Sequence, residues 1–135
     1  MDDTTPSDHP EIRRVINDWH RSIVRRDLDG VIAAHTDGIV MFDVPPPERG
    51  VRGLAAYAAS WPPFFEWLSS GASFEIDELD IVAGDDVAFA WALLRCGSVD
   101  DLRERPDRRL RLTLGLRRVA TGWIIEHEHH SFTNP

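Results

Sequence analysis

The apolar residues of this chain change their spacing once, shortly after its midpoint. Between residues 10 and 68 they recur about every three or four positions, the period of a helix that buries one face. From residue 74 onward they follow the two-residue period of a β-strand. Four strand candidates lie at residues 74–82, 87–96, 110–119 and 123–132. Helices that precede consecutive strands predict an α+β fold, with helices on one face of a curved, mostly antiparallel sheet.

Local signals mark the ends of the first two expected helices. Pro10 suits the first turn of a helix, because the N–H that proline lacks has no partner there. Asp27 is expected to cap a short second helix by accepting hydrogen bonds from the unpaired N–H groups of its first turn. Gly38 is expected to break that second helix.

The segments between these helices and the four strands are also predictable. A third helix is expected over residues 53–59; the Pro-Pro pair at 62–63 interrupts it, and it restarts in the apolar residues that follow. Residues 39–42 form a short apolar strand, and the proline-rich residues 44–47 an extended loop. The charged stretch 100–108 is interpreted as a solvated hairpin loop.

Charge and cysteine content exclude several classes of protein. Arginine supplies all 15 positive charges, and 23 acidic residues leave a formal net charge of −8. A nucleic-acid binder needs a basic stripe, so we expect no nucleic-acid partner. No apolar run approaches the roughly 20 residues of a membrane span, and the acidic start of the chain is unlike a signal peptide. Cys96 is the single cysteine, and the chain is expected to be soluble and cytoplasmic. Its expected organisation is a flexible tail at residues 1–9 and a single domain over residues 10–135.

Several local strings, taken in order, resemble the nuclear transport factor 2-like superfamily, and within it the SnoaL-like and ketosteroid-isomerase-like proteins. They are Trp19, the string DLDG at residues 27–30, FDVP at 42–45 with the Arg-Gly pair that follows, and GWIIEHEHHS at 122–131. The resemblance spans residues 10–133. It implies a cone in which a bent sheet wraps around helices and leaves an apolar pocket, and it implies homodimers formed through the sheet. Members include isomerases, cyclases, dehydratases, epoxide hydrolases and noncatalytic binding proteins.

Asp43 is the first candidate for acid–base chemistry. It ends an apolar strand, and a carboxylate in apolar surroundings can serve as a general base. The alternative is that Asp43 caps the turn before Val44 and Pro45. By resemblance, Asp43 matches the proton-shuttling aspartate of ketosteroid isomerases. Their helix tyrosine is replaced here by Trp19, and residues 110–119 contain no acidic residue, so the resemblance does not extend to the usual steroid isomerisation.

The last strand carries a second group of candidates. With a strict period of two, His127 and His129 share one face with Ile125, whereas Glu128 and His130 share the other. Hydrophobicity leaves open which face looks inward, but resemblance to association domains with a similar closing string favours Glu128 and His130 as pocket residues. A histidine beside a carboxylate suits acid–base work near pH 7. His127 and His129 are expected in a cross-strand or interface hydrogen-bond ladder.

We expect no metal and no cofactor. His127 and His129 are spaced as a ligand pair, but zinc needs at least a third protein ligand. Only Cys96, His20, His35 or a distant carboxylate could supply it.

The aromatic residues suggest the wall of a ligand cavity. Most of them must belong to the core, but some are expected to line an apolar cavity closed by a few polar groups. The expected binding residues are Trp19, His20, Phe42, Tyr57, Trp61, Phe65 and Glu128. Cys96 is interpreted as a small core residue.

These features predict a pocket protein for a hydrophobic, carbonyl-bearing or polycyclic small molecule. The chemistry would be isomerisation, cyclisation or dehydration without a cofactor, with Asp43 as the base and His130 or Trp19 polarising an oxygen. A noncatalytic ligand-binding or dimerisation module is the alternative. Both faces of the strand at 87–96 are apolar, so a homodimer through the outer face of the sheet is expected.

Overall fold

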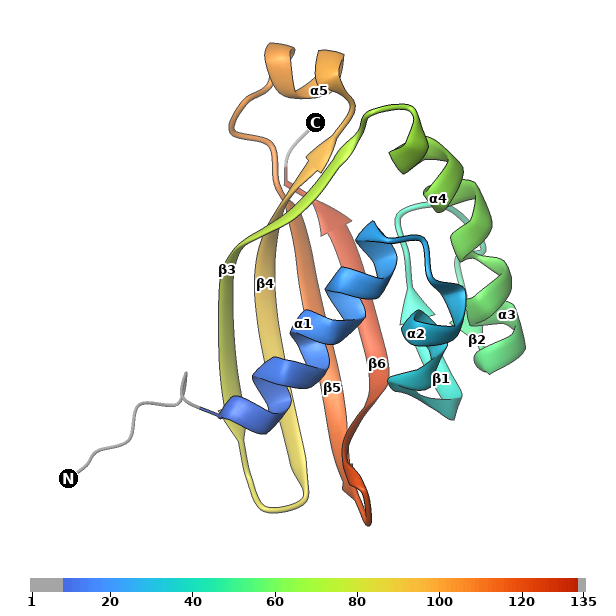
Figure 1. The fold of residues 1–135 in the computed structure, drawn as a ribbon, viewed down its shortest axis with the longest axis vertical. Coiled ribbons are helices and arrows are strands. Elements are labelled where there is room, and N and C mark those ends of the chain that lie inside the picture. The colour runs from blue at the N-terminus through green and yellow to red at the C-terminus, as the bar shows by residue number, and fades with distance from the viewer. Residues whose placement is uncertain (1–8, 134–135) are drawn as a thin grey trace, which may run out of the picture.

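The change of period separates helices from strands in the computed structural model of the chain, which describes residues 9–133 (Figure 1). The elements in chain order are α1 (Pro10–Val24), α2 (Leu28–Ala33), β1 (His35–Phe42), β2 (Val51–Arg52), α3 (Leu54–Ala59), α4 (Trp61–Ser69), β3 (Ser73–Ala83), β4 (Val87–Gly97), α5 (Val99–Glu104), β5 (Leu110–Val119) and β6 (Gly122–Phe132). Except for His9, the tail expected at residues 1–9 lies outside the described residues. None of the described helices is long and apolar enough to cross a membrane.

The six strands form one open, mostly antiparallel sheet in the order β2-β1-β6-β5-β4-β3. The strands β3 to β6 follow one another as the predicted meander, and the parallel pair β1/β6 joins the N-terminal strand to the last one. Figure 1 shows α1 lying across one face of the sheet and α2, α3 and α4 gathered beside β1. The α+β architecture with N-terminal helices on a bent sheet is confirmed.

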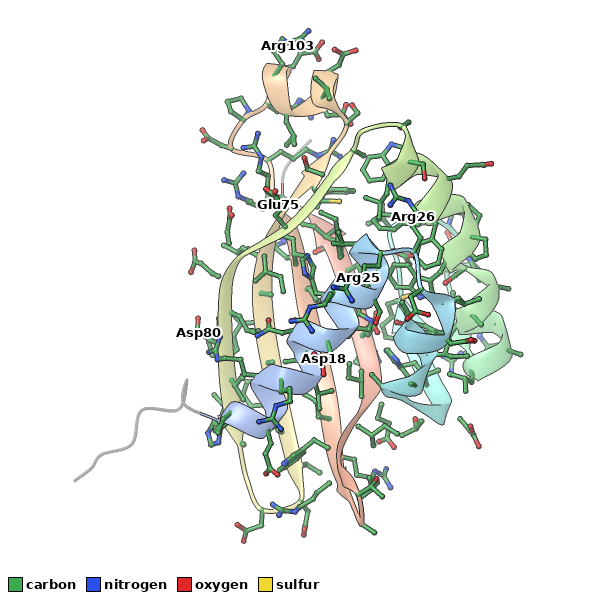
Figure 2. All side chains as sticks on the ribbon, viewed as in Figure 1. Asp18, Arg25, Arg26, Glu75, Asp80 and Arg103 are labelled. Atoms are coloured by element: carbon green, nitrogen blue, oxygen red, sulfur yellow. The ribbon has the colours of Figure 1, made fainter. Side chains whose placement is uncertain are left out.

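Helix α1 is amphipathic and covers the inner face of the sheet. Its buried residues recur at helical spacing and are Ile12, Ile16, Trp19 and Ile23. Pro10 lies in the first turn, as predicted. Asp18 and Arg25 project away from the sheet (Figure 2). Full burial of each large apolar side chain stabilises the fold by about 1.5–3 kcal/mol, so this stripe fixes α1 against the strands.

The second helix and the first strand differ in part from the prediction. Asp27 caps α2 as expected, since its side chain accepts from the Gly30 N–H at 3.2 Å. However, α2 ends at Ala33 without a glycine, and Gly38 lies inside β1. Strand β1 begins at His35, earlier than predicted, because the exposed residues 37–38 hide its apolar pattern while the backbone pairs with β6.

Two further expectations are wrong in detail. The prolines at 62–63 do not interrupt a helix: α4 already begins at Trp61 and holds both in its first turn, where their missing N–H groups need no partner. The stretch 100–108, predicted as a solvated loop, contains all of α5 except its first residue. Ser98 and Asp101 form a capping box at its start, but a helix with the single buried residue Leu102 leaves no periodic signal in the sequence.

A bulge in β6 changes which residues face inward. Leu116 pairs with Ile125, and the preceding Gly115 pairs with His127, so Glu126 is an extra residue in the ladder. Ile125 is therefore fully buried on the same face as Glu128, not on the face of His127 as the strict period of two predicted.

Candidate active site

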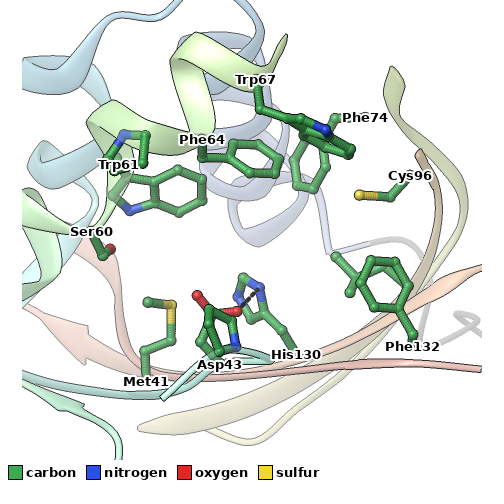
Figure 3. Close-up of a pocket in the computed structure, with 13 residues that line it drawn as sticks. Met41, Asp43, Ser60, Trp61, Phe64, Trp67, Phe74, Cys96, His130 and Phe132 are labelled. Atoms are coloured by element: carbon green, nitrogen blue, oxygen red, sulfur yellow. Dashed lines mark ion pairs between the residues drawn. The ribbon is translucent and has the colours of Figure 1, made fainter. Parts of the chain in front are cut away.

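An apolar cavity of about 310 Å³ opens between α4 and the inner face of the sheet (Figure 3). Its aromatic wall consists of Trp61, Phe64, Trp67, Phe74 and Phe132. Its polar lining side chains are Asp43, Ser60 and His130. Asp43 and His130 lie across the cavity from the α4 aromatics. A predominantly apolar cavity with few polar groups is typical of a small-molecule site.

Asp43 and His130 are brought together by the parallel pair β1/β6. Phe42 is the register partner of His129, so the next residue of each strand falls side by side at the ends of the two strands. The Asp43 Oδ1 lies 3.7 Å from the His130 Nδ1, and the side chains are 27% and 7% exposed. The same Oδ1 accepts the Val44 N–H at 2.8 Å. Asp43 thus has both features that the sequence left as alternatives, a turn contact and a place on the cavity wall.

Glu128 lies fully buried behind His130 and accepts three hydrogen bonds from side chains. The His130 Nε2–H donates to its Oε1 at 2.8 Å, and the Tyr57 hydroxyl donates to its Oε2 at 2.6 Å. The His35 Nε2 also contacts this Oε2. This carboxylate is therefore bound to three groups from three different elements, and it fixes the plane of the His130 ring.

The charges of this cluster stabilise one another. Burial alone would raise the pKa of Glu128, but the hydrogen bonds from His130 and His35 and their positive charges lower it to about 2. Burial alone would lower the pKa of His130, but the hydrogen bond to Glu128 and the charges of Glu128 and Asp43 outweigh burial and raise it. A larger fraction of His130 than of an ordinary histidine is therefore cationic near neutral pH.

The inner end of the cluster is closed off in the core. The His35 Nδ1–H donates to the Val31 carbonyl at 2.9 Å, so both ring nitrogens of His35 face acceptors and its ring is held between Val31 and Glu128. The Tyr57 hydroxyl accepts from the Trp19 Nε1–H at 3.0 Å. Burial and the charge of Glu128 raise the pKa of Tyr57, which keeps its hydroxyl a donor.

The structure brings together only some of the expected site residues. Asp43, Trp61 and His130 line the cavity, and Glu128 contacts His130 from behind. Trp19 and Tyr57 do not line it, because α1 and α3 pack them fully into the core one layer behind Trp61. Trp19 donates its single N–H to Tyr57 and therefore does not polarise a ligand oxygen in this arrangement.

Three further expected residues also lie outside the cavity lining. Phe42 is on the outer face, edge-on to His127 and His129, because it alternates with the inward-facing Met41. Phe65 packs against Trp61 without lining the cavity. His20 borders a separate hollow and donates its Nε2–H to the Phe74 carbonyl at 2.7 Å.

The sequence did not point to His35 as a partner of Glu128. The two residues are separated by 93 positions, and His35 stands at a helix-strand junction without a motif. The aromatic residues Phe64, Trp67 and Phe74 were also not assigned to the site. Their only signal was the density of aromatic residues after position 60.

The remaining histidines of β6 face outward. The His127 Nδ1–H donates to the Val40 carbonyl at 2.7 Å, and His129 is exposed, whereas Glu128 and His130 face inward. Within residues 9–133, no group of three or more His, Cys, Asp or Glu side chains is arranged to hold a metal ion. Burial raises the pKa of the Cys96 thiol to about 12, so Cys96 is a protonated wall residue and not a nucleophile at neutral pH.

The N-terminal helices, the bent sheet and the cavity between them define a protein of the nuclear transport factor 2-like class. A sequence model of the SnoaL-like domain matches residues 12–135, and the chain belongs to this family.

Solved structures agree with this assignment. An NTF2-like protein of unknown function from Pseudomonas putida KT2440 is 33% identical, with a TM-score of 0.80 over 96% of this chain and 89% of that one. An NTF2-like protein with a cystatin-like fold from Novosphingobium aromaticivorans is 18% identical, with a TM-score of 0.75 over 94% and 82%. A ketosteroid isomerase-like protein from Erwinia carotovora atroseptica SCRI1043 is 20% identical, with a TM-score of 0.64 over 93% and 96%. No curated protein sequence matches the chain significantly.

Proposed function

We propose that this protein is an enzyme that moves protons on a hydrophobic carbonyl compound without a cofactor. The observation that carries the proposal is the position of His130 between the buried Glu128 and the cavity-lining Asp43, on the wall of an otherwise apolar cavity. Paired acid and base groups with different environments, inside a cavity, are the usual requirement for this chemistry.

Asp43 is the base in this proposal. Its carboxylate removes a proton from the carbon next to the carbonyl, and the electron pair of the broken C–H bond moves to the carbonyl oxygen as an enolate forms. The His130 Nδ1 lies 3.7 Å from the Asp43 carboxylate, and in this proposal its N–H donates a hydrogen bond to the carbonyl oxygen, so its positive charge stabilises the enolate. Return of the proton from Asp43 to another carbon completes an isomerisation, and its transfer to a departing hydroxyl group completes a dehydration.

Glu128 and the residues behind it restrict His130 to this role. The Nε2–H of His130 is held by Glu128, and the cluster ends at the Val31 carbonyl and at Trp19 without reaching the cavity again. Nδ1 is therefore the nitrogen of His130 that can exchange a proton with a ligand or with Asp43.

The likeness to a ketosteroid isomerase-like protein supports the class of reaction but not a steroid substrate. Tyr57, a tyrosine near the site, donates to Glu128 inside the core and does not face the cavity. The acid that stabilises the enolate in our proposal is His130 instead.

Proton exchange in D₂O tests the proposal directly. The protein is incubated with a panel of aromatic and alicyclic ketones and β,γ-unsaturated ketones, and deuterium incorporation or double-bond migration is followed by NMR. We expect catalysed exchange that is lost in His130→Gln and retained in His129→Gln, whose side chain is exposed on the outer face. Binding of a ketone in the cavity without any exchange above buffer would contradict the enzymatic proposal and favour a noncatalytic ligand-binding protein.

We also propose that two copies pair through the outer face of the sheet. Val87, Phe89 and Trp91 of β4 point outward and are 64%, 49% and 44% exposed, and the last two rings stack at 5.9 Å. The acidic side chains Glu78 and Asp80 of β3 lie on one side of this patch, and Arg111 and Arg117 of β5 lie on the other. A twofold axis that runs along β4, over the patch, would set the acidic residues of one copy against the basic residues of the other.

Its single thiol, Cys96, needs no oxidising compartment, and we infer that the protein acts in the cytoplasm.

A further inference from the structure

Register partners on neighbouring strands form rows that cross the outer face of the sheet. Leu93 of β4 pairs with Glu78 of β3 on one side and with Arg111 of β5 on the other. This row therefore has an acidic residue at one end, an apolar residue in the middle and a basic residue at the other end. Because β3 is the edge strand of the sheet, the acidic end of the row lies along that edge (Figure 1).

The neighbouring row, two residues further along the strands, also has unlike ends. Trp91 pairs with Asp80 on β3 and with Thr113 on β5. Trp91 and Thr113 are both exposed. A threonine hydroxyl can donate a hydrogen bond to a carboxylate, so the two ends of this row are complementary as well.

The third row has a gap at one end. Phe89 pairs with the exposed Val82 on β3 and with Gly115 on β5. Among the described residues, a Cβ atom at Gly115 would contact only the His127 Cβ, at an ordinary distance of 3.4 Å, and the backbone there has no positive φ. Neither the local packing nor the backbone conformation requires glycine at this position. A glycine inside a strand often marks a place where another segment approaches closely.

We propose that a second copy of the chain packs against these rows through a twofold axis along β4, so that Glu78 of each copy pairs with Arg111 of the other. Such an axis lays β4 over β4 and β3 over β5, and it keeps the position along the strands. Each row then meets the same row of the other copy in reverse order. The inference rests on the proposed dimer and deepens it, because it names the residues that meet.

The other two rows fit under the same axis. Asp80 of one copy lies over Thr113 of the other, where the hydroxyl can donate to the carboxylate. Val82 lies over Gly115, so that an apolar side chain fills the gap at the glycine. A single axis thus matches all three rows, two of them by polar complementarity and one by shape.

The charges disfavour the other arrangement with aligned strands. When two sheets pack face to face with their strands aligned, the twofold axis runs nearly along β4 or nearly across it. An axis across the strands keeps each strand over its own copy. The basic residues of β5 would then face each other, as would the acidic residues of β3, and like charges in an interface are unfavourable.

Glu78 and Arg111 are available to pair between copies. Within one copy they stand two strands apart, about 10 Å, with Leu93 between them. Arg111 donates to the Ser131 Oγ at 3.2 Å and to the Phe132 carbonyl at 3.1 Å, and the remaining N–H groups of its guanidinium can donate to a further acceptor. Glu78 is exposed and forms no ion pair with any residue in the described range 9–133.

A charge exchange tests the pairing. The dimer dissociation constant is measured by sedimentation equilibrium for the wild type, Glu78→Arg, Arg111→Glu and the double variant. Each single change should raise this constant about tenfold or more, because the axis places two contacts between like charges in every dimer. The double variant should return to within about threefold of the wild type. Glu66→Arg, the same change at an exposed position of α4, should leave the constant unchanged.

Gly115→Val tests the shape of the interface without a change of charge. The added side chain occupies the gap that Val82 of the other copy fills in the proposed dimer, so the dimer should weaken. The fold, followed by circular dichroism, should be kept, because a Cβ atom at this position meets only an ordinary contact.

A wild-type dimer whose dissociation constant is unchanged in both single variants would overturn the inference and leave the dimer itself in place. A double variant that stays as weak as the single variants would overturn it too. A tighter dimer in Arg111→Glu would indicate an axis across the strands and would also overturn it. A monomeric wild type would overturn both the dimer and the inference, and would leave this face to a different partner.

Discussion

Glu128→Gln replaces a buried carboxylate with an amide of the same shape and removes one charge from the centre of the cluster. The amide oxygen can still accept from Tyr57 and His35, as the Glu128 Oε2 does. The amide NH₂ then faces the Nε2 of His130, which must give up its hydrogen to accept from it. The variant should therefore contain a neutral His130 whose hydrogen is on Nδ1.

The cost in stability can be worked out in two ways. A carboxyl whose pKa is about 2 in the folded protein and 4.5 in an unperturbed chain stabilises the fold by about 3 kcal/mol at neutral pH. Removing one charge of a buried ion pair typically costs about 3–5 kcal/mol. Because the amide keeps some of the hydrogen bonds, we expect the lower value of about 3 kcal/mol, which corresponds to a fall in Tm of about 10 °C.

Thermal melts and NMR titration of the histidine ring signals measure both effects. The raised pKa of His130 should fall in Glu128→Gln, since burial is then opposed only by the charge of Asp43. Catalysed proton exchange should fall as well. Glu126→Gln is the matched control: it removes an exposed carboxylate of the same strand, paired with Arg117, and should cost less than about 1 kcal/mol. An unchanged Tm and an unchanged His130 titration in Glu128→Gln would refute the reasoning.

Three further outcomes are expected. Asp43→Asn should reduce catalysed proton exchange in the D₂O assay about 10²-fold. Its unfolding free energy, measured by chemical denaturation, should change by less than about 1 kcal/mol, because the amide oxygen can still accept from the Val44 N–H. Normal exchange in this variant would show that Asp43 is not the base. The free energy of unfolding should fall as the pH drops from about 4.5 toward 2, because Glu128 is then protonated. It should also fall as the pH rises above 6.5, because His130 then loses its proton through its raised pKa. A profile that is flat in both ranges would contradict the mutual stabilisation of Glu128 and His130. In sedimentation velocity runs, Trp91→Glu should sediment as a monomer and the wild type as a dimer. Val99→Glu, a control at an exposed position outside the sheet, should also sediment as a dimer. A monomeric wild type would contradict the proposed dimer.

Local patterns were sufficient to predict most of the fold. The apolar stripe of α1, the cap at Asp27 and the alternation in β3 to β6 each depend on neighbours within a few residues, and each occurs where the pattern placed it. The short elements β2 and α5 were not predicted, because neither has a local pattern of apolar residues. A strand of two residues is too short to display a period, and α5 contains a single buried residue, Leu102, among charged neighbours.

The candidate site was predictable only in part, because its contacts join distant segments. The closing string of the chain favoured Glu128 and His130 as inward residues, and they face inward. The bulge that moves Ile125 to the same face depends on the pairing with Leu116 and Gly115, which no local pattern in β6 records. The contact of His35 with Glu128 likewise arises only when the start of β1 lies against β6.

The buried cluster around Glu128 is not required for the stability of the fold as such. A buried ion pair loses much of its electrostatic attraction to the cost of removing both charges from water, and well-packed apolar residues often replace such a pair at no loss. An apolar core at the positions of His35, Glu128 and Tyr57 could therefore support the same sheet. Such an apolar core could not hold a cationic His130 whose Nε2–H is bound by Glu128 and whose Nδ1 is directed toward Asp43. The property that the cluster adds is a fixed positive charge on the wall of an apolar cavity, where the low polarity of the surroundings strengthens its action on a developing enolate.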